Sequence, residues 1–166
     1  MRLPTLCLSL LALFAGGFPA AETPAVPMAP DGLVVLTFDD SVASHATFVA
    51  PLLKKHGFGA TFYITEGFEF LQDKTHYLTW DQIKAMHDAG FEIGNHTKAH
   101  KAVSGQKPAD IAADLDHIEK RCIENGIPVP TTFSYPGYAT SPAATEVLRT
   151  RGYLLARAGG ARVFDP

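Results

Sequence analysis

The sequence has little cysteine and no excess of basic residues. Two cysteines, Cys7 and Cys122, occur in 166 residues, and the net charge is -3. Nucleic-acid binding therefore has no electrostatic support. The one apolar run, near the start, is too short to span a bilayer comfortably. With 46% hydrophobic and 19% charged residues, the composition is that of an ordinary globular chain of one domain.

The first 21 residues have the pattern of a secretory signal peptide. Arg2 supplies a positive start, Leu6 to Phe14 are almost entirely apolar, and small residues follow as far as Ala21. We therefore expect export to the periplasm or outside the cell, with no stable membrane insertion after cleavage. The alternative is an N-terminal helix packed on the domain. Cleavage would remove Cys7 and leave no partner for a disulfide.

Downstream of this segment the sequence predicts a Pro-rich linker and one domain. Residues 22–31 contain three prolines and cannot hold a helix. Apolar, β-branched runs predict strands at 33–38, 59–65, 91–94, 132–135 and 153–156. Helical periodicity and capping residues predict helices at 44–55, 80–89, 107–125 and 142–151. This alternation indicates an α/β domain of parallel strands over 32–166, as either a barrel or an open sheet.

Polar residues gather at the carboxyl ends of two predicted strands, where sites form in parallel α/β folds. Asp39 and Asp40 follow the first strand, and His96 and His100 follow the third. If the histidine segment is helical, both rings face one side. One carboxylate and two imidazoles form a usual catalytic zinc set, which leaves the second aspartate free as a base. The alternatives are an aspartate turn or cap and a solvated histidine face.

Several segments together resemble a known family. Thr37–Asp40 and His96–His100 are similar to the first two motifs of the polysaccharide deacetylases of the NodB-homology type, carbohydrate esterase family 4. The strand around Ala60–Tyr63 and the segment Phe91–Asn95 that leads into the histidines also look like that family. The resemblance runs from Leu33 to about Tyr153 and so covers most of the predicted domain.

The resemblance implies a fold, a cofactor and a reaction. The fold would be a distorted (β/α) barrel. Asp39 would be the catalytic base, and Asp40, His96 and His100 would bind one divalent metal ion, commonly Zn²⁺. The substrate would be an N-acetylated polysaccharide or oligosaccharide that loses its acetyl group as acetate. Two alternatives stay open: a non-catalytic carbohydrate-binding relative that keeps the metal pocket, and a related metal-dependent amidase or esterase. No pattern indicates an oligomeric state.

The sequence departs from the family pattern after the fourth predicted strand. Ser134 stands where the family has an arginine that pairs with the base. We predict that Arg157, after the fifth strand, takes over this role. Pro136 fits the motif and Tyr138 offers its aromatic residue one position late. We expect Tyr135, Pro136 and Tyr138 to contact substrate, although packing is an almost equal alternative for the two tyrosines.

Two further expectations concern the chain end and the remaining histidines. The family's acid histidine belongs to a later motif, so we expect this domain to be truncated at its C-terminus and its barrel to be incomplete. The other histidines fall on predicted helices or loops away from strand ends, where surface positions are expected: His45, His56, His76, His87 and His117. Trp80 and Phe91 are expected in the core.

Overall fold

The structure, a computed structural model, describes residues 32–160. Residues 34–160 belong to one compact unit. The predicted signal peptide, the linker and the last six residues lie outside the described residues, so their assignments stay predictions. Within the described range, no helix combines the length and the apolar character needed to cross a membrane.

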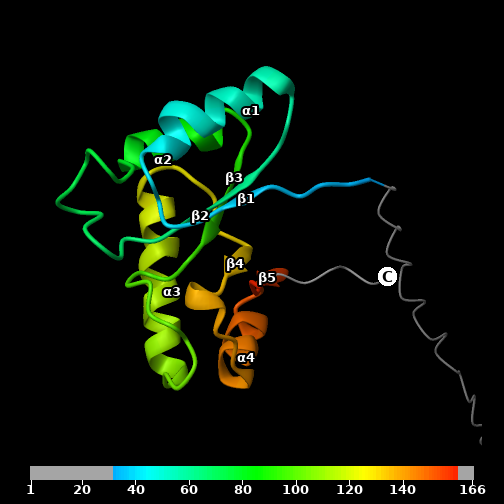
Figure 1. Cartoon of the computed structure of the whole chain (residues 1–166). Coiled ribbons are helices and arrows are strands. Elements are labelled where there is room, and N and C mark those ends of the chain that lie inside the picture. The colour runs from blue at the N-terminus through cyan, green and yellow to red at the C-terminus, as the bar shows by residue number, and fades with distance from the viewer. Residues whose placement is uncertain (1–31, 161–166) are drawn as a thin grey trace, which may run out of the picture. The chain divides into compact units, whose positions relative to one another are not determined.

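The described unit is built on five parallel strands in sequence order, β1-β2-β3-β4-β5 (Figure 1). The strands are β1 (Thr37–Phe38), β2 (Thr61–Ile64), β3 (Glu92–Asn95), β4 (Thr132–Ser134) and β5 (Leu155–Arg157). Because parallel neighbours need crossover connections, the intervening segments form helices. The predicted alternation is thereby confirmed.

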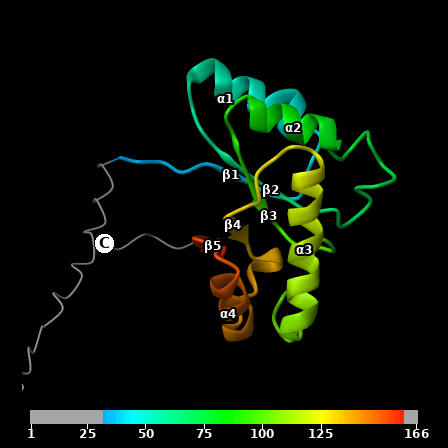
Figure 2. The ribbon, with the colours of Figure 1, turned by 180° about the vertical axis from the view of Figure 1, so that it is seen from behind.

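The helices match the predicted order (Figures 1 and 2). They are α1 (Ala50–His56), α2 (Trp80–Asp88), α3 (Pro108–Glu124) and α4 (Pro142–Thr150), with short turns η1 (His45–Val49, a π-helix) and η2 (Pro136–Tyr138). Thr79 and Gln82 form the expected reciprocal cap of α2. Ser141 caps α4 by accepting a hydrogen bond from the Ala144 amide.

The sheet is curled rather than flat. β1 and β5 are its two edges, yet Arg157 on β5 bonds to Asp39, which directly follows β1. This contact requires the edges to approach each other across the inner face. The architecture is therefore a half-barrel with helices packed on its outside, as the barrel expectation required, and the open-sheet alternative is wrong.

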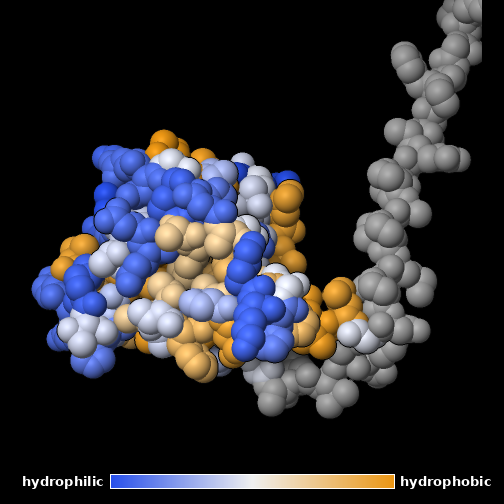
Figure 3. All heavy atoms as spheres, turned by 90° about the horizontal axis from the view of Figure 1, so that it is seen from above, coloured by the Kyte–Doolittle hydropathy of each residue, from blue (hydrophilic) through white to orange (hydrophobic). Residues whose placement is uncertain are grey.

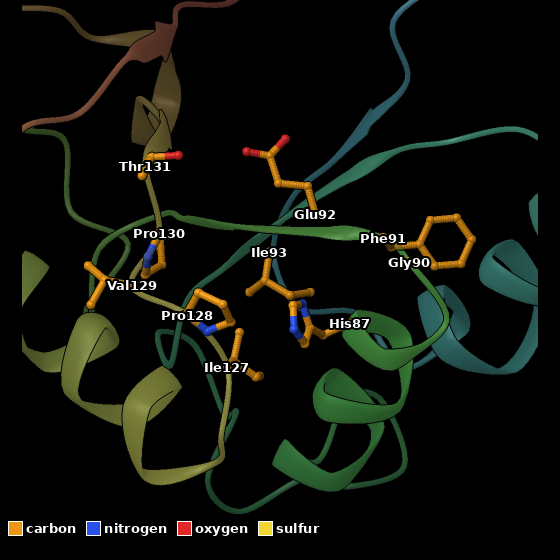
Figure 4. Close-up of a pocket in the computed structure, with 10 residues that line it drawn as sticks. All are labelled: His87, Gly90, Phe91, Glu92, Ile93, Ile127, Pro128, Val129, Pro130 and Thr131. Carbon is orange, nitrogen blue, oxygen red and sulfur yellow. The ribbon is translucent and has the colours of Figure 1, made fainter.

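Side chains alternate between the two faces of the strands. Figure 4 shows Glu92 and Ile93 pointing to opposite sides of β3. The outward set packs against the helices in two apolar clusters, one centred on Phe62, Ile83 and Ile118 and one on Leu115 and Phe133. The inward set is mostly polar. Figure 3 shows an apolar area bordered by hydrophilic residues on the face seen from above.

The first strand differs from its prediction. We expected residues 33–38 to be buried on both faces, but β1 covers only Thr37–Phe38. Leu33, Val34 and Val35 are 59–74% exposed because the described residues provide no neighbouring strand or helix over them. Trp80 and Phe91 lie in the core as predicted, and Cys122 is also buried there.

Candidate active site

Three potential metal ligands converge at the carboxyl ends of β1 and β3. Asp40 Oδ1 lies 3.0 Å from His100 Nε2 and 3.4 Å from His96 Nε2. One donor atom from each residue lies within 4.8 Å of the other two. Tetrahedral ligands around 2.0–2.1 Å from zinc are separated by roughly 3.3 Å, so this spacing suits one ion. The structure thus brings together the three residues that the sequence singled out.

The hydrogen bonding of His96 prepares it to act as a ligand. Its ring is 2% exposed, and Nδ1 lies 2.7 Å from the Ser134 carbonyl oxygen. A carbonyl can only accept, so Nδ1 carries the proton and Nε2 keeps its lone pair facing Asp40. Burial lowers the pKa of His96, although the Ser134 carbonyl and nearby carboxylates oppose this effect. A neutral imidazole is the form that binds metals.

The histidine segment is a tight turn, so the two rings do not converge through the helical geometry that was considered for them. Thr97 and His100 have φ values of 65° and 52°. The Thr97 amide donates to Asn95 Oδ1, and the His100 amide donates to Thr97 Oγ1. These side-chain hydrogen bonds replace helical ones, and they bring the two imidazoles to a centroid distance of 4.8 Å by a different route.

Ser41 ties the end of β1 to the end of β2. It is fully buried, its hydroxyl donates to the Thr65 carbonyl, and it accepts a hydrogen bond from the Thr65 amide. Asp40 and Ser41 both have positive φ, 72° and 55°. Glycine would adopt this backbone easily but would lack both hydrogen bonds. Ser41 therefore has a specific structural contribution, because it holds the ends of β1 and β2 together.

Asp39 is held by residues from β4 and β5. Its Oδ2 accepts hydrogen bonds from Arg157 and, at 3.3 Å, from Ser134 Oγ. The same Arg157 nitrogen donates to Ser134 Oγ at 2.7 Å, and the two residues are register partners in the sheet. Asp39 Oδ1 accepts no hydrogen bond from the described residues. The structure thus places a guanidinium beside Asp39 and leaves one carboxylate oxygen free.

The donor set fits a divalent cation. Asp40 Oδ1 is buried and accepts no hydrogen bond from the described residues, although two imidazole nitrogens approach it closely. A buried carboxylate oxygen without a hydrogen bond is costly. A cation shared with the two imidazoles would satisfy it. Asp40, His96 and His100 would hold such an ion, and Asp39, bonded to Arg157 instead, would stay outside the set.

The donors open into a small pocket of about 220 Å³ that Tyr135, Gly137 and Tyr138 complete. Tyr138 is 58% exposed, and its ring lies over Gly159, where a Cβ atom would collide with it. Tyr135 borders the pocket but is 4% exposed and packs edge-on against Phe133. The packing alternative therefore accounts for the Tyr135 ring. Pro136 is buried within η2.

Two histidines do not occupy the surface positions expected for them. His45 is 8% exposed and lies between the rings of Phe38 and Phe62 in the core. Its helix begins immediately after the Asp39–Asp40 turn and points the ring inward. His117 bonds to Glu66, whose side chain is 4% exposed. No local sequence pattern predicts either contact. The His117–Glu66 contact joins residues that are distant in sequence, and the burial of the His45 ring depends on the angle of the preceding turn.

A second hollow, of about 380 Å³, lies near the opposite ends of β3 and β4 (Figure 4). Ile93, Ile127 and Pro128 line it, together with His87. Its one carboxylate, Glu92, points away from Ile93 and accepts hydrogen bonds from Thr61 and Thr132. No group of metal donors was found there among the described residues. The candidate site is therefore the Asp40–His96–His100 centre.

Comparison with known proteins agrees with this geometry. The family model for polysaccharide deacetylase matches residues 28–156. The chain belongs to this family. One relative is YxkH of Bacillus subtilis (strain 168), which is named as a polysaccharide deacetylase. It is 32% identical to this chain over 121 residues. A chitin deacetylase of Pestalotiopsis sp is 28% identical over 119 residues.

Solved structures of other proteins share the fold. IcaB from Ammonifex degensii superposes with a TM-score of 0.68 at 27% identity and covers 78% of this chain and 62% of its own. The Streptococcus pyogenes deacetylase PplD, solved with acetate, gives 0.68 at 21% identity, over 76% of this chain and 56% of its own. This chain covers 42% of the length of YxkH and 38% of that of the chitin deacetylase.

Proposed function

We propose that this protein hydrolyses the acetamido group of an N-acetylated polysaccharide or oligosaccharide and releases acetate, with one divalent metal ion, Zn²⁺, at Asp40, His96 and His100. The observation that carries the proposal is the convergence of these donors beside an aspartate that is not needed as a ligand. Membership of the deacetylase family supports the reaction class.

An amide resists hydrolysis because water is a poor nucleophile and the tetrahedral oxyanion is costly. An ion held by Asp40, His96 and His100 would supply Lewis acidity, which polarises a carbonyl and lowers the pKa of water to about 7. Asp39 Oδ1, free of other hydrogen bonds within the described residues, takes a proton from the attacking water. The leaving amine also needs a proton, and the family's acid histidine belongs to a later motif than those present in this chain.

Arg157 acts as a positioning residue in this proposal. Its guanidinium and the Ser134 hydroxyl share Asp39 Oδ2 and so fix the orientation of the carboxylate. Arg157→Ala should lower kcat and change the pH profile, while zinc affinity stays the same. Since Ser134 and Arg157 are register partners, the exchange Ser134→Arg with Arg157→Ser should restore part of the loss. If Arg157→Ala has an unchanged rate and pH profile, Arg157 is not a positioning residue for Asp39.

Acetate release from an N-acetylated tetrasaccharide tests the reaction itself. Zinc-loaded protein should release acetate, a chelator should stop the release, and added zinc should restore it. Asp39→Asn should abolish turnover, whereas Asp110→Asn, an exposed aspartate in the first turn of α3, should not. Glycan binding without acetate release would favour the non-catalytic relative. Faster release from aryl acetates than from glycans would favour the esterase alternative.

We also propose that the protein is exported. The support is the pattern of residues 1–21, a positive start, an apolar run and small residues, which is typical of a cleaved signal peptide. Expression of the full chain in a bacterial host, followed by fractionation and N-terminal sequencing, tests this. A mature protein that begins near residue 22 outside the cytoplasm is the expected result. Uncleaved protein in the cytoplasm would contradict it.

A further inference from the structure

Six residues other than glycine have positive φ in the described range, and all six follow the carboxyl ends of strands at the candidate site. They are Asp40, Ser41, Phe68, Thr97, His100 and Tyr138. Such a backbone is costly for a side chain with a Cβ atom, and strained positions of this kind cluster at functional sites. Five of the six are metal ligands, their immediate neighbours or pocket residues. Phe68 is the sixth and has no assigned role.

Phe68 lies on the loop between β2 and α2, which projects well beyond the sheet in Figure 1. Its ring is 55% exposed, so packing does not account for the strained backbone. One neighbour is the His100 ring, with centroids 4.5 Å apart, and the other is the nearly parallel Tyr77 ring at 6.2 Å. An exposed phenylalanine ring, backed by the half-buried Tyr77, therefore lies directly against one of the candidate metal donors.

The loop is fixed in this position. A Cβ atom on Gly67 would lie 2.8 Å from His100 Cβ, so the two segments are in close backbone contact. On the other side, Tyr77 pairs with Val42 through an antiparallel bridge next to the Asp40–Ser41 turn. The two segments that contact the loop, one with His100 and one with Asp40, each carry a proposed metal donor. Phe68 and Tyr77 are consequently held in a constant relation to the site.

We propose that Phe68 and Tyr77 form a stacking platform for a sugar ring next to the one that carries the reacting acetamide, so that the protein acts on chains of two or more sugars. This proposal rests on the function proposed above. The donor pocket, about 220 Å³, is smaller than typical small-molecule sites and has room for little more than one sugar. A neighbouring sugar must then lie on the surface outside it.

The chemistry of the platform suits a pyranose. One face of such a ring presents several C–H groups, which carry a small positive charge and pack on the negative face of an aromatic ring. Phe68 presents an exposed ring beside His100 with Tyr77 next to it, and the exposed Tyr138 ring is part of the lining of the donor pocket.

Binding of an N-acetylated tetrasaccharide to the zinc-loaded full chain tests the platform. All variants are made with Asp39→Asn, so that the ligand is not consumed. Phe68→Leu keeps apolar bulk against His100 but removes the π face, and it should weaken binding about three- to tenfold. Phe68→Trp should retain affinity. Phe58→Leu is the matched control, because Phe58 is 60% exposed and lies at the far end of α1 beside His56.

Zinc affinity, measured for each variant, separates a platform from a support for His100. Weaker glycan binding at unchanged zinc affinity supports the platform. Wild-type affinity in Phe68→Leu, or a loss of zinc binding in proportion to the loss of glycan binding, would overturn it. Acetate release by the chain without Asp39→Asn reports separately on the proposed function, so protein that binds the glycan through Phe68 but releases no acetate would refute the enzyme and keep the platform.

Discussion

Replacement of Glu66 should release the loop that carries Phe68. The Glu66 side chain is 4% exposed and accepts three hydrogen bonds: from Trp80 Nε1 at 2.7 Å, His117 Nε2 at 2.7 Å and Arg121 Nε at 3.0 Å. It follows β2 directly and joins the loop to α2 and α3. Each charge-assisted hydrogen bond contributes about 1.5–3 kcal/mol before solvent screening.

The expected loss of stability depends on which hydrogen-bond donors lose Glu66 as their acceptor. Glu66→Gln can still accept from Trp80 but loses its charge toward His117 and Arg121, whose side chains are 29% and 32% exposed. Partial exposure reduces the loss, so we expect destabilisation by about 2 kcal/mol. Glu66→Ala also leaves the indole N–H without its acceptor and should cost about 3 kcal/mol or slightly more.

The pH dependence of stability is an independent check that ionised Glu66 stabilises the fold. Burial raises the pKa of Glu66, but the hydrogen bonds from His117, Trp80 and Arg121 outweigh burial and hold the pKa below its usual value of 4.5. The folded state therefore binds the proton less tightly than the unfolded state. The stabilisation is fully present above about pH 4.5 and is lost as the pH falls through the folded pKa.

Urea denaturation of wild type, Glu66→Gln and Glu66→Ala at pH 7 and at pH 3 measures both effects. The control is Glu69→Gln, an exposed glutamate on the same loop, which should stay within about 0.5 kcal/mol of wild type. The m-value should not change. A Glu66→Gln variant as stable as wild type at pH 7, or an equal deficit at pH 3, would refute the reasoning.

Other predictions test the inner face, the core and the strained loop. Gly94→Ala should cost about 1–3 kcal/mol in urea denaturation, since its Cβ would lie 2.4 Å from the buried Tyr63 ring, whereas Gly59→Ala meets no atom within 4 Å. Burial raises the pKa of Cys122 to about 12. Alkylation of this thiol at pH 8, followed by mass spectrometry, should therefore be slow until urea unfolds the chain. The free energy of unfolding should also fall as the pH rises above 9, because the unfolded chain loses the thiol proton first. Phe68→Gly should be about 1 kcal/mol more stable than Phe68→Ala, because φ is 57°; the opposite order would argue against backbone strain.

The sequence predicted the order and type of the elements because each carries a local signal. Thr79 with Gln82 marks a capping box, and the apolar stripe of α3 from Ile111 to Cys122 marks its buried face. The extent of the first strand was predicted less well. Whether Val34 and Val35 are buried depends on which element covers them, and apolar character alone does not contain that information.

The metal donors could be predicted, but the way they converge could not. Parallel strands bring Asp40 and His96 to one edge of a sheet, and that much follows from topology. The segment between His96 and His100 is a turn and not a helix, because the Asn95 and Thr97 side chains accept hydrogen bonds from the backbone amides. The burial of His45 and the Glu66–His117 pair depend on tertiary packing, which no periodicity reveals.

The pairing of Ser134 with Arg157 shows how the inner face holds Asp39. In a curled sheet, neighbouring strands present register partners to the same point, and here both partners contact Asp39 Oδ2. Ser134 is small and fully buried, so it leaves room for the Arg157 guanidinium, and it still donates a hydrogen bond to the same oxygen. We therefore expect the position of the charge beside Asp39, and not the strand that supplies it, to be the constraint, which the combined Ser134→Arg and Arg157→Ser substitutions test.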